Sequence, residues 1–238
     1  MKTKLFFPSL ILLTALTLVG CGPRARVGAL QTETRTVELD GAESVRVEII
    51  LGAGDLTVSG GAENLLDAHF TYNVAVLKPQ VTFTDGILVV RQPNTEGLPN
   101  LQNITDFRNE WNLNLNDDMP MNMSINMGAG NSSMQLAGLS LTGLDVSLGA
   151  GTSTLDLNGD WTQDVDITVD SGAADIIVRL PKNVGVRVEV DRGPTAIYAS
   201  GLTQNDNVYV NAAYGTSEAT LDIKIEAGVG LIRLEVEE

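Results

Sequence analysis

The sequence predicts an all-β protein whose C-terminal part is a β-solenoid, a stack of similar coils. Apolar and polar residues alternate along most of the chain, which is typical of strands that are buried on one face. Glycine-rich segments interrupt the alternation at Gly128, Gly149, Gly172 and Gly193, with spacings of 21 to 23 residues. A fixed period of about 20 to 50 residues is the sequence signature of stacked repeats. No long stretch carries a convincing helical pattern, so strands are expected throughout.

The repeat is clearest over residues 145–157, where two short alternating strands flank Gly149-Ala150-Gly151. Because glycine adopts positive φ without a Cβ penalty, both glycines are expected to turn the chain at a corner. Thr152 and Ser153 follow the corner and are expected to face solvent. Structural corners of this kind are expected at Gly52, Gly54, Gly128, Gly130, Gly149, Gly151, Gly172 and Gly193.

Residues 1–20 are expected to be a lipoprotein signal peptide. Two lysines precede an apolar run of 15 residues, 5–19, which is shorter than the ~20 residues of a membrane span and suits a signal sequence. The run ends in Leu-Val-Gly-Cys, which resembles the bacterial lipobox, and this resemblance implies that Cys21 carries the lipid. An ordinary secretory signal followed by a chance cysteine is the alternative.

Three further segments follow the leader. Residues 21–36 show no apolar periodicity and are expected to be a lipid-anchored tether. Residues 37–115 are expected to form an N-terminal β region that caps one end of the stack. This region includes a β-hairpin at Asp85-Gly86, since a two-residue Asp-Gly turn joins two apolar alternations there. Residues 116–238 are expected to form the repeating coils.

The charge and the rare residue types exclude several classes of protein. The formal net charge is −15, and removal of the leader would leave 13 basic and 30 acidic residues. Nucleic-acid binding depends on neutralising phosphates with Lys and Arg, so no nucleic-acid partner is expected. A single cysteine, Cys21, excludes an intrachain disulfide, and a single histidine, His69, excludes a multi-histidine zinc site. The polar alternate neighbours of His69 place it on the solvent face of a strand.

Two patterns raise the question of a metal site, and neither predicts one. Met119, Met121 and Met123 alternate as thioether ligands of copper(I) would, but Ile125 and Met127 continue the same parity, so a core-facing strand explains them. The glycine-rich nonapeptide of calcium-binding β-helices is not found. Carboxylates on the solvent face and at corners are therefore expected at Asp156, Asp160, Asp164, Asp166, Asp170 and Asp175. No cofactor is expected.

Catalysis is not expected either. Glycoside cleavage needs a defined pair of acids, whereas the acids of this chain are spread over many outward positions. Between Asp117 and Asp175 there is no Lys or Arg to serve as the base or clamp of a polysaccharide lyase. The sequence contains neither the phosphate-binding pattern GxxxxGK nor the nucleophile pattern GxSxG.

Several stretches carry a resemblance to a known family. Residues 45–62, with Val-Glu-Ile-Ile-Leu-Gly-Ala-Gly-Asp-Leu at their centre, resemble the opening of the toast-rack N-terminal domain family, and residues 70–72 and 78–81 fit that opening. Residues 176–186 resemble the strand-Pro-Lys-strand step of cell-wall-active antibiotic response proteins and of adhesin-like domains. Over residues 40–238, the resemblance implies a single-stranded, right-handed β-solenoid that is often extracytoplasmic.

The leader and the resemblance together predict a lipid-anchored protein outside the cytoplasm, on the cell membrane or the outer membrane. We expect a structural or adhesin-like interaction module of the cell envelope, with the membrane and an envelope protein or glycan as partners. The alternatives are an accessory sensor of envelope stress and a carbohydrate-binding protein. An exposed row of aromatic side chains would favour carbohydrate binding, and the candidates for it are Trp111, Trp161, Tyr198, Tyr209 and Tyr214.

Overall fold

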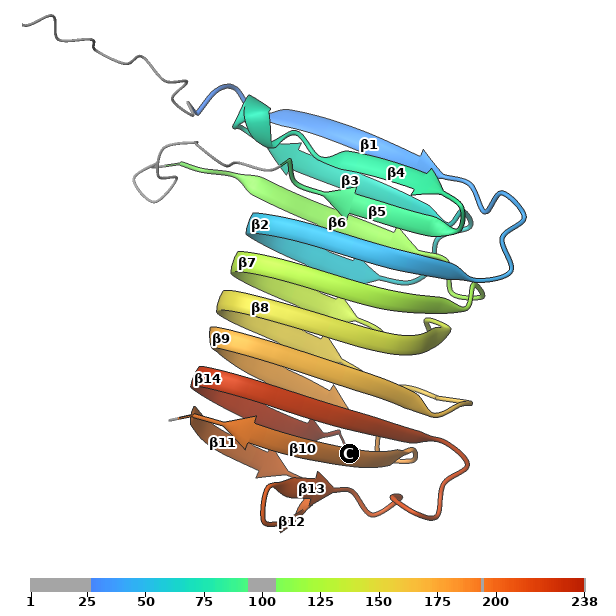
Figure 1. Ribbon diagram of the computed structural model, residues 1–238, viewed down its shortest axis with the longest axis vertical. Coiled ribbons are helices and arrows are strands. Elements are labelled where there is room, and N and C mark those ends of the chain that lie inside the picture. Colours follow the sequence, from blue (N-terminus) through green and yellow to red (C-terminus); the bar gives the residue numbers. More distant parts are fainter. Residues whose placement is uncertain (1–26, 94–105, 194, 238) are drawn as a thin grey trace, which may run out of the picture.

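The computed structural model describes residues 27–93, 106–193 and 195–237, so the leader and Cys21 lie outside the described residues. These residues form one sheet of 14 strands and a short 3₁₀-helix, η1 (Figure 1), and none of their helices is long and apolar enough to span a bilayer. In chain order the elements are β1 (Gln31–Val37), β2 (Val45–Ser59), β3 (Leu66–Tyr72), η1 (Ala75–Leu77), β4 (Gln80–Thr84), β5 (Ile87–Arg91), β6 (Asn109–Leu115), β7 (Met121–Gln135), β8 (Leu141–Asp156), β9 (Val165–Leu180), β10 (Gly185–Arg192), β11 (Thr195–Ser200), β12 (Thr203–Asn205), β13 (Val208–Val210) and β14 (Thr220–Val236).

Five long strands form the body of the molecule and run parallel in the spatial order β2, β7, β8, β9 and β14. Each strand bends near its middle, so that its two halves lie in two facing layers (Figure 1). Alternate side chains point between the layers. In β8, Val146 and Leu148 precede the bend, Leu155 follows it, and all three are buried. The expected all-β fold of stacked coils is confirmed.

The methionines show that alternation decides which side chains enter the core. Met121 and Met123 in β7 are fully buried, and Ile125 and Met127 lie buried on the same face of the strand. Removing apolar surface from water in this way stabilises the fold by about 25 cal/mol per Å². The core interpretation of the Met-x-Met-x-Met pattern is therefore confirmed.

Short strands extend both layers beyond β2 at the N-terminal end of the stack. The antiparallel strands β6, β3 and β1 continue one layer, and the antiparallel hairpin β5–β4 continues the other. Asp85 and Gly86 have φ values of 51° and 74°, which are the two positive values that a tight hairpin turn requires. The expected hairpin and the expected sheet cap are both present.

The structure corrects the expected segment boundaries at two places. β1 begins at Gln31, so the second part of the stretch 21–36 is a paired strand and no tether. β1 has mostly exposed side chains on both faces, which explains why its sequence carries no apolar periodicity. β2 pairs with β7 along almost its whole length, so the stack of coils begins at Val45 and not near residue 116.

The structure also corrects the expected order of the coils. Gly193 was expected to follow Gly172 in the stack, but the C-terminal strand β14 lies between β9 and β10. β14 carries buried apolar residues in both halves, whereas five of the six residues of β11 are exposed or half-buried. β14 takes an interior position with a neighbour on each side, and β10, β11 and the β12–β13 hairpin end the stack.

Candidate functional site: the glycine corners and their groove

The bends of the coils form one continuous row along the stack. Its first glycines follow the spatial order Gly52, Gly128, Gly149, Gly172, Gly228 and Gly193. A Cβ atom at Gly149 would overlap the carbonyl oxygen of Gly128, and one at Gly193 would lie 2.6 Å from the carbonyl oxygen of Gly228. Real side chains do not approach a carbonyl this closely, so the backbones of successive corners are in direct contact.

The two glycines of a corner are needed for different reasons. The second glycine has positive φ: +145° at Gly54, +130° at Gly130 and +133° at Gly151. The first glycine, exemplified by Gly149, does not have positive φ, so the expectation that both glycines turn through this region is wrong for the first one. At that position the requirement is the close approach of the neighbouring corner.

The hydroxyl residues after the corner differ from each other in burial. Thr152 is exposed as expected, but Ser153 is only 2% exposed, so the expectation that it faces solvent is wrong. The Ser153 hydroxyl lies 2.7 Å from the hydroxyl of Ser132, the equivalent residue of β7, and the two share a hydrogen bond. A pair of small hydroxyl residues therefore fills the inner side of the bend, where the core narrows.

A long open groove of about 800 Å³ runs along the outer side of the first glycines and crosses six strands. One column of side chains borders it, two residues before each first glycine, and the pairing registers place its members next to one another. In spatial order the column reads Ile50, Asn126, Ser147, Asp170, Glu226 and Asp191. The groove is thus apolar or neutral toward β2 and acidic toward β10.

The acidic part of this column is only partly neutralised. Glu226 accepts a hydrogen bond from Lys224, and this hydrogen bond, together with the charge of Glu226, raises the pKa of Lys224 above its usual value. Asp170 and Asp191 flank Glu226 on the neighbouring strands, ~4.8 Å away along the stack. Among the described side chains that line the groove, Asp170, Glu226 and Asp191 are the charged ones, and all three lie toward its β10 end.

Two buried amides close the corner row at its β2 end. The Gln92 side-chain oxygen accepts hydrogen bonds from the backbone N–H groups of Gly52 and Ala53, at 3.1 and 3.3 Å. The Asn109 amide donates to the carbonyl oxygen of Ala53 at 2.7 Å and accepts from the Trp111 indole at 2.9 Å. These contacts replace the coil that would come next, and no sequence signal marked either residue.

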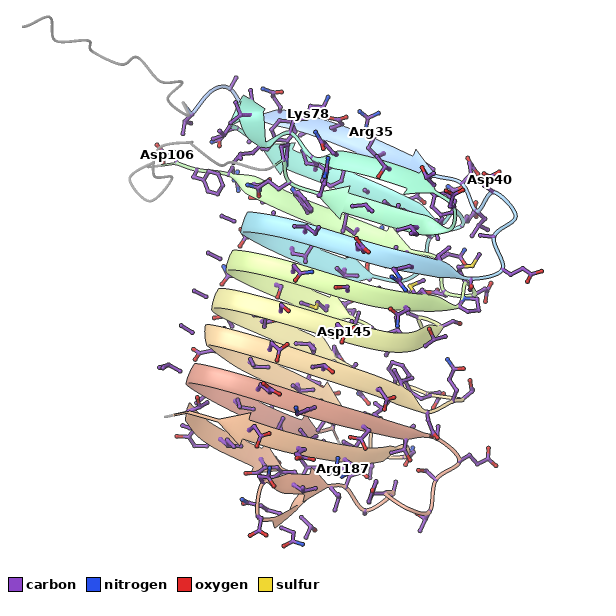
Figure 2. All side chains as sticks on the ribbon, in the orientation of Figure 1. Arg35, Asp40, Lys78, Asp106, Asp145 and Arg187 are labelled. Atoms are coloured by element: carbon purple, nitrogen blue, oxygen red, sulfur yellow. The ribbon has the colours of Figure 1, made fainter. Side chains whose placement is uncertain are left out.

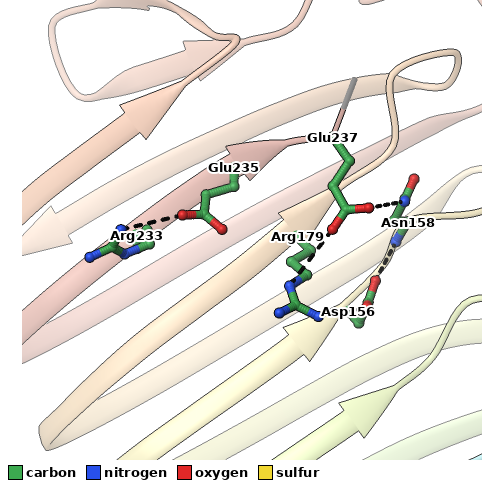
Figure 3. A network of polar contacts seen from close by, with 6 residues as sticks. All are labelled: Asp156, Asn158, Arg179, Arg233, Glu235 and Glu237. Carbon is green, nitrogen blue, oxygen red and sulfur yellow. Dashed lines mark hydrogen bonds and ion pairs between the residues drawn. The ribbon is translucent and has the colours of Figure 1, made fainter.

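Several of the carboxylates singled out in the sequence have structural partners. Asp164 and Asp175 accept hydrogen bonds from the backbone N–H groups of Thr220 and Leu231, both in β14. Asp156 pairs with Arg179 at 3.3 Å in a network on the other layer (Figure 3). This network continues from Arg179 to Glu237 and Asn158, and a separate pair joins Arg233 to Glu235. Within the described ranges, no group of three or more His, Cys, Asp and Glu side chains could hold a metal ion.

The aromatic side chains do not form an exposed row. Trp111 and Tyr209 are buried, and the half-buried Trp161 donates its indole N–H to the carbonyl oxygen of Leu157. Only Tyr198 and Tyr214 are exposed among the five candidates. His69 lies on the exposed face of β3 beside Thr34, as expected.

Stacked, bent strands with an open groove along their glycine corners define a β-solenoid scaffold. The chain belongs to the family described as the N-terminal domain of toast_rack, DUF2154, whose model matches residues 26–179. It is similar to the crystal structure of a "putative cell adhesion protein" from Clostridium sporogenes, with 32% identity and a TM-score of 0.84 over 88% of this chain and 100% of that one.

A second solved structure, a "putative adhesin" from Bacteroides fragilis, is 12% identical over 89% of this chain and 99% of that one. Its TM-score is 0.37, which is too low to support any argument about this chain. No curated protein matches the chain.

Alanine substitutions at two corner glycines and at Gly215, which lies between β13 and β14 outside the corner row, should separate backbone strain from close approach. Gly215→Ala adds only backbone strain, because Gly215 has φ +79° and nothing lies near its Cβ position. The free energy of unfolding should fall by ~1 kcal/mol. Gly149→Ala adds only overlap, at about 2–3 kcal/mol, and Gly151→Ala adds both. Urea unfolding measures the losses, and a loss at Gly149 no larger than at Gly215 would contradict the contact between corners.

The amide that closes the corner row should matter more than its exposed neighbour. Asn109→Ala leaves the carbonyl of Ala53 and the indole N–H of Trp111 without a buried partner, so the free energy of unfolding should fall by about 2–3 kcal/mol. Asn112→Ala, on the exposed face of the same strand, is the matched control and should change it by less than about 0.5 kcal/mol. Equal effects in urea unfolding would show that Asn109 does not cap the row.

Proposed function

We propose that the protein is a lipid-anchored, extracytoplasmic, adhesin-like module that binds a partner and carries out no catalysis. The observation that carries the proposal is the similarity to the cell adhesion structure over 88% of the chain, at 32% identity. The leader, the Leu-Val-Gly-Cys sequence and the acylation expected at Cys21 supply the anchor and the location.

The groove is the part of the scaffold that suits a partner best. It crosses six parallel strands, which at ~4.8 Å per strand gives a length of about 24 Å. Small-molecule sites enclose most of their ligand, whereas this groove is open along its length and therefore suits an extended polymer. Its bottom is formed by glycine backbone, which lets a ligand chain approach closely.

The charge of the groove selects the chemistry of that polymer. Asp170, Glu226 and Asp191 border one end, and the other described side chains that line the groove are uncharged. A segment of an envelope protein or a glycan that carries positive charges at regular intervals would match this end. None of the described residues that line the groove is aromatic, so the groove itself offers no stacking surface for a neutral glycan.

The anchor can be tested in cells. Cys21→Ser should release the protein from the membrane into the soluble extracytoplasmic fraction, because several acyl chains give stable anchoring and none would then be attached. Fractionation followed by mass spectrometry of the mature N-terminus measures this. A Cys21→Ser variant that stays as membrane-bound as the parent would contradict the proposed lipid anchor.

The groove can be tested with a short oligolysine peptide as a model of a cationic polymer. Asp170→Asn should weaken its binding about fivefold, which corresponds to ~1 kcal/mol. Asp166→Asn removes the same charge from an exposed position of the same strand outside the groove, and it should weaken binding less than about twofold. Titration calorimetry measures the dissociation constant of the peptide for both variants. Equal losses of affinity would mean that the peptide binds through the overall negative charge of the protein and not in the groove.

A further inference from the structure

The groove between β1 and β4, at one end of the stack, differs in charge from the corner groove. β1 and β4 are the last strands of the two layers, and Figure 2 shows Arg35 and Lys78 at this end. A groove of about 520 Å³ opens between the two strands. Arg35 and Lys78 line it together with six uncharged residues, and no carboxylate is among the described residues that line it. On a chain with a net charge of −15, this is an unusual surface.

The two cations of this end share a single carboxylate. Lys78 lies 3.0 Å from Glu33, and Arg35 also pairs with Glu33. Burial by itself raises the pKa of Glu33, but the hydrogen bond from Lys78 and the charges of Arg35 and Lys78 together outweigh it and hold the pKa below its usual value. Glu33 is therefore ionised at neutral pH, and the cluster keeps one net positive charge. Both cations remain about half exposed, at 51% and 54% of their side chains.

Exposed apolar side chains lie at the same end of the stack, in η1 and in the segment before β1. Among the described residues, Val27, Leu30 and Val76 are large apolar residues that are 38%, 52% and 50% exposed. Segment 27–30 lies beside the start of η1, because the N–H of Gly28 donates to the carbonyl oxygen of Asn73 at 2.7 Å (Figure 1). Exposed apolar side chains next to cations are the combination that favours the interface of an anionic bilayer.

The length of the chain before Val27 limits how far this end can be from the anchor. Six residue steps separate Cys21 from Val27, and an extended chain covers at most ~3.6 Å per step, or about 20 Å in total. Arg24 and Arg26 belong to this short segment. An acylated Cys21 would therefore hold the β1–β4 end close to the lipid headgroups at all times.

We propose that the β1–β4 end of the stack rests on an anionic lipid bilayer, with Val27, Leu30 and Val76 at the interface and Arg35 and Lys78 on lipid phosphates. This docking rests on the proposed lipid anchor and adds an orientation to it. The stack then extends away from the membrane. β11 is the ninth strand of its layer counted from β1, so it lies ~40 Å from the membrane surface. The acidic end of the corner groove, at β14 and β10, points away from the anionic surface.

The test compares two valines of similar exposure in the full-length, acylated protein. Val76→Cys and Val229→Cys each introduce one free thiol, because acylation blocks that of Cys21; Val229 is 56% exposed and lies at the corner of β14. An environment-sensitive fluorophore is attached, and the protein is reconstituted into vesicles of phosphatidylglycerol and phosphatidylethanolamine that contain brominated lipid. Quenching of the Val76 label should exceed that of the Val229 label at least threefold.

Charge-matched variants test the contribution of the cations. Lys78→Gln should reduce the quenching of the Val76 label at least twofold, whereas Lys182→Gln, at an exposed position between β9 and β10, should leave it unchanged. In vesicles of phosphatidylcholine alone, the quenching of the Val76 label should fall by the same factor as it does with Lys78→Gln. Equal effects of the two lysine variants, or equal quenching in both kinds of vesicle, would overturn the assignment of the phosphates to Lys78.

The outcomes separate the docking from the anchor on which it rests. Protein that floats with the vesicles while both labels are quenched equally would retain the anchor and overturn the docking. Protein that lacks the lipid on Cys21 and does not float would overturn both. A circular dichroism spectrum identical to that of the parent shows that the exposed substitutions leave the fold intact.

Discussion

The direct contact between the backbones of successive corners is the constraint on which the rest of the structure depends. A carbonyl oxygen of one corner occupies the place that a Cβ atom of the next corner would need, as between Gly128 and Gly149. Between two Gly-Ala-Gly corners, only one register brings both glycines of one strand onto both glycines of the next, so the contact fixes which side chains face each other along the stack. Because the five long strands all bend at the same level, their two halves form two layers, and the alternating apolar residues close a core between them.

The same contact explains the open groove and the need for caps. A row of residues without side chains leaves a groove, and the column of side chains from Ile50 to Asp191 forms its border. Backbone groups at the end of such a row would be unpaired and partly buried, which is costly. Gln92 and Asn109 supply the missing partners at the β2 end. At the other end, the hydroxyl group of Thr195 donates to the carbonyl oxygen of Gly228 at 3.0 Å.

The position of β14 makes the stack dependent on its own C-terminus. β9 and β10 are joined by only a few residues, yet β14 lies between them and pairs with both. β9 therefore gains its second neighbour only after residues 220–236 are available. Contacts that are distant in sequence form slowly because loop closure must come first, so the C-terminal coil is expected to complete the fold late. The ion pairs of Arg179 with Asp156 and Glu237 join the C-terminal end of β14 to β8 and β9 (Figure 3).

The sequence by itself determined the strands, the inward face of each strand, the hairpin at Asp85-Gly86 and the place of the corners, because these follow from local patterns of period two and from glycine. Tertiary structure decided the order of the coils, the burial of Ser153 and the capping by Gln92 and Asn109. It also decided that β1 is a strand, since mostly exposed side chains carry no periodic signal. Each of these depends on which segment lies alongside. β14 carries apolar residues for the core in both of its halves and pairs on both sides, so it takes an interior position that its place at the end of the chain does not reveal.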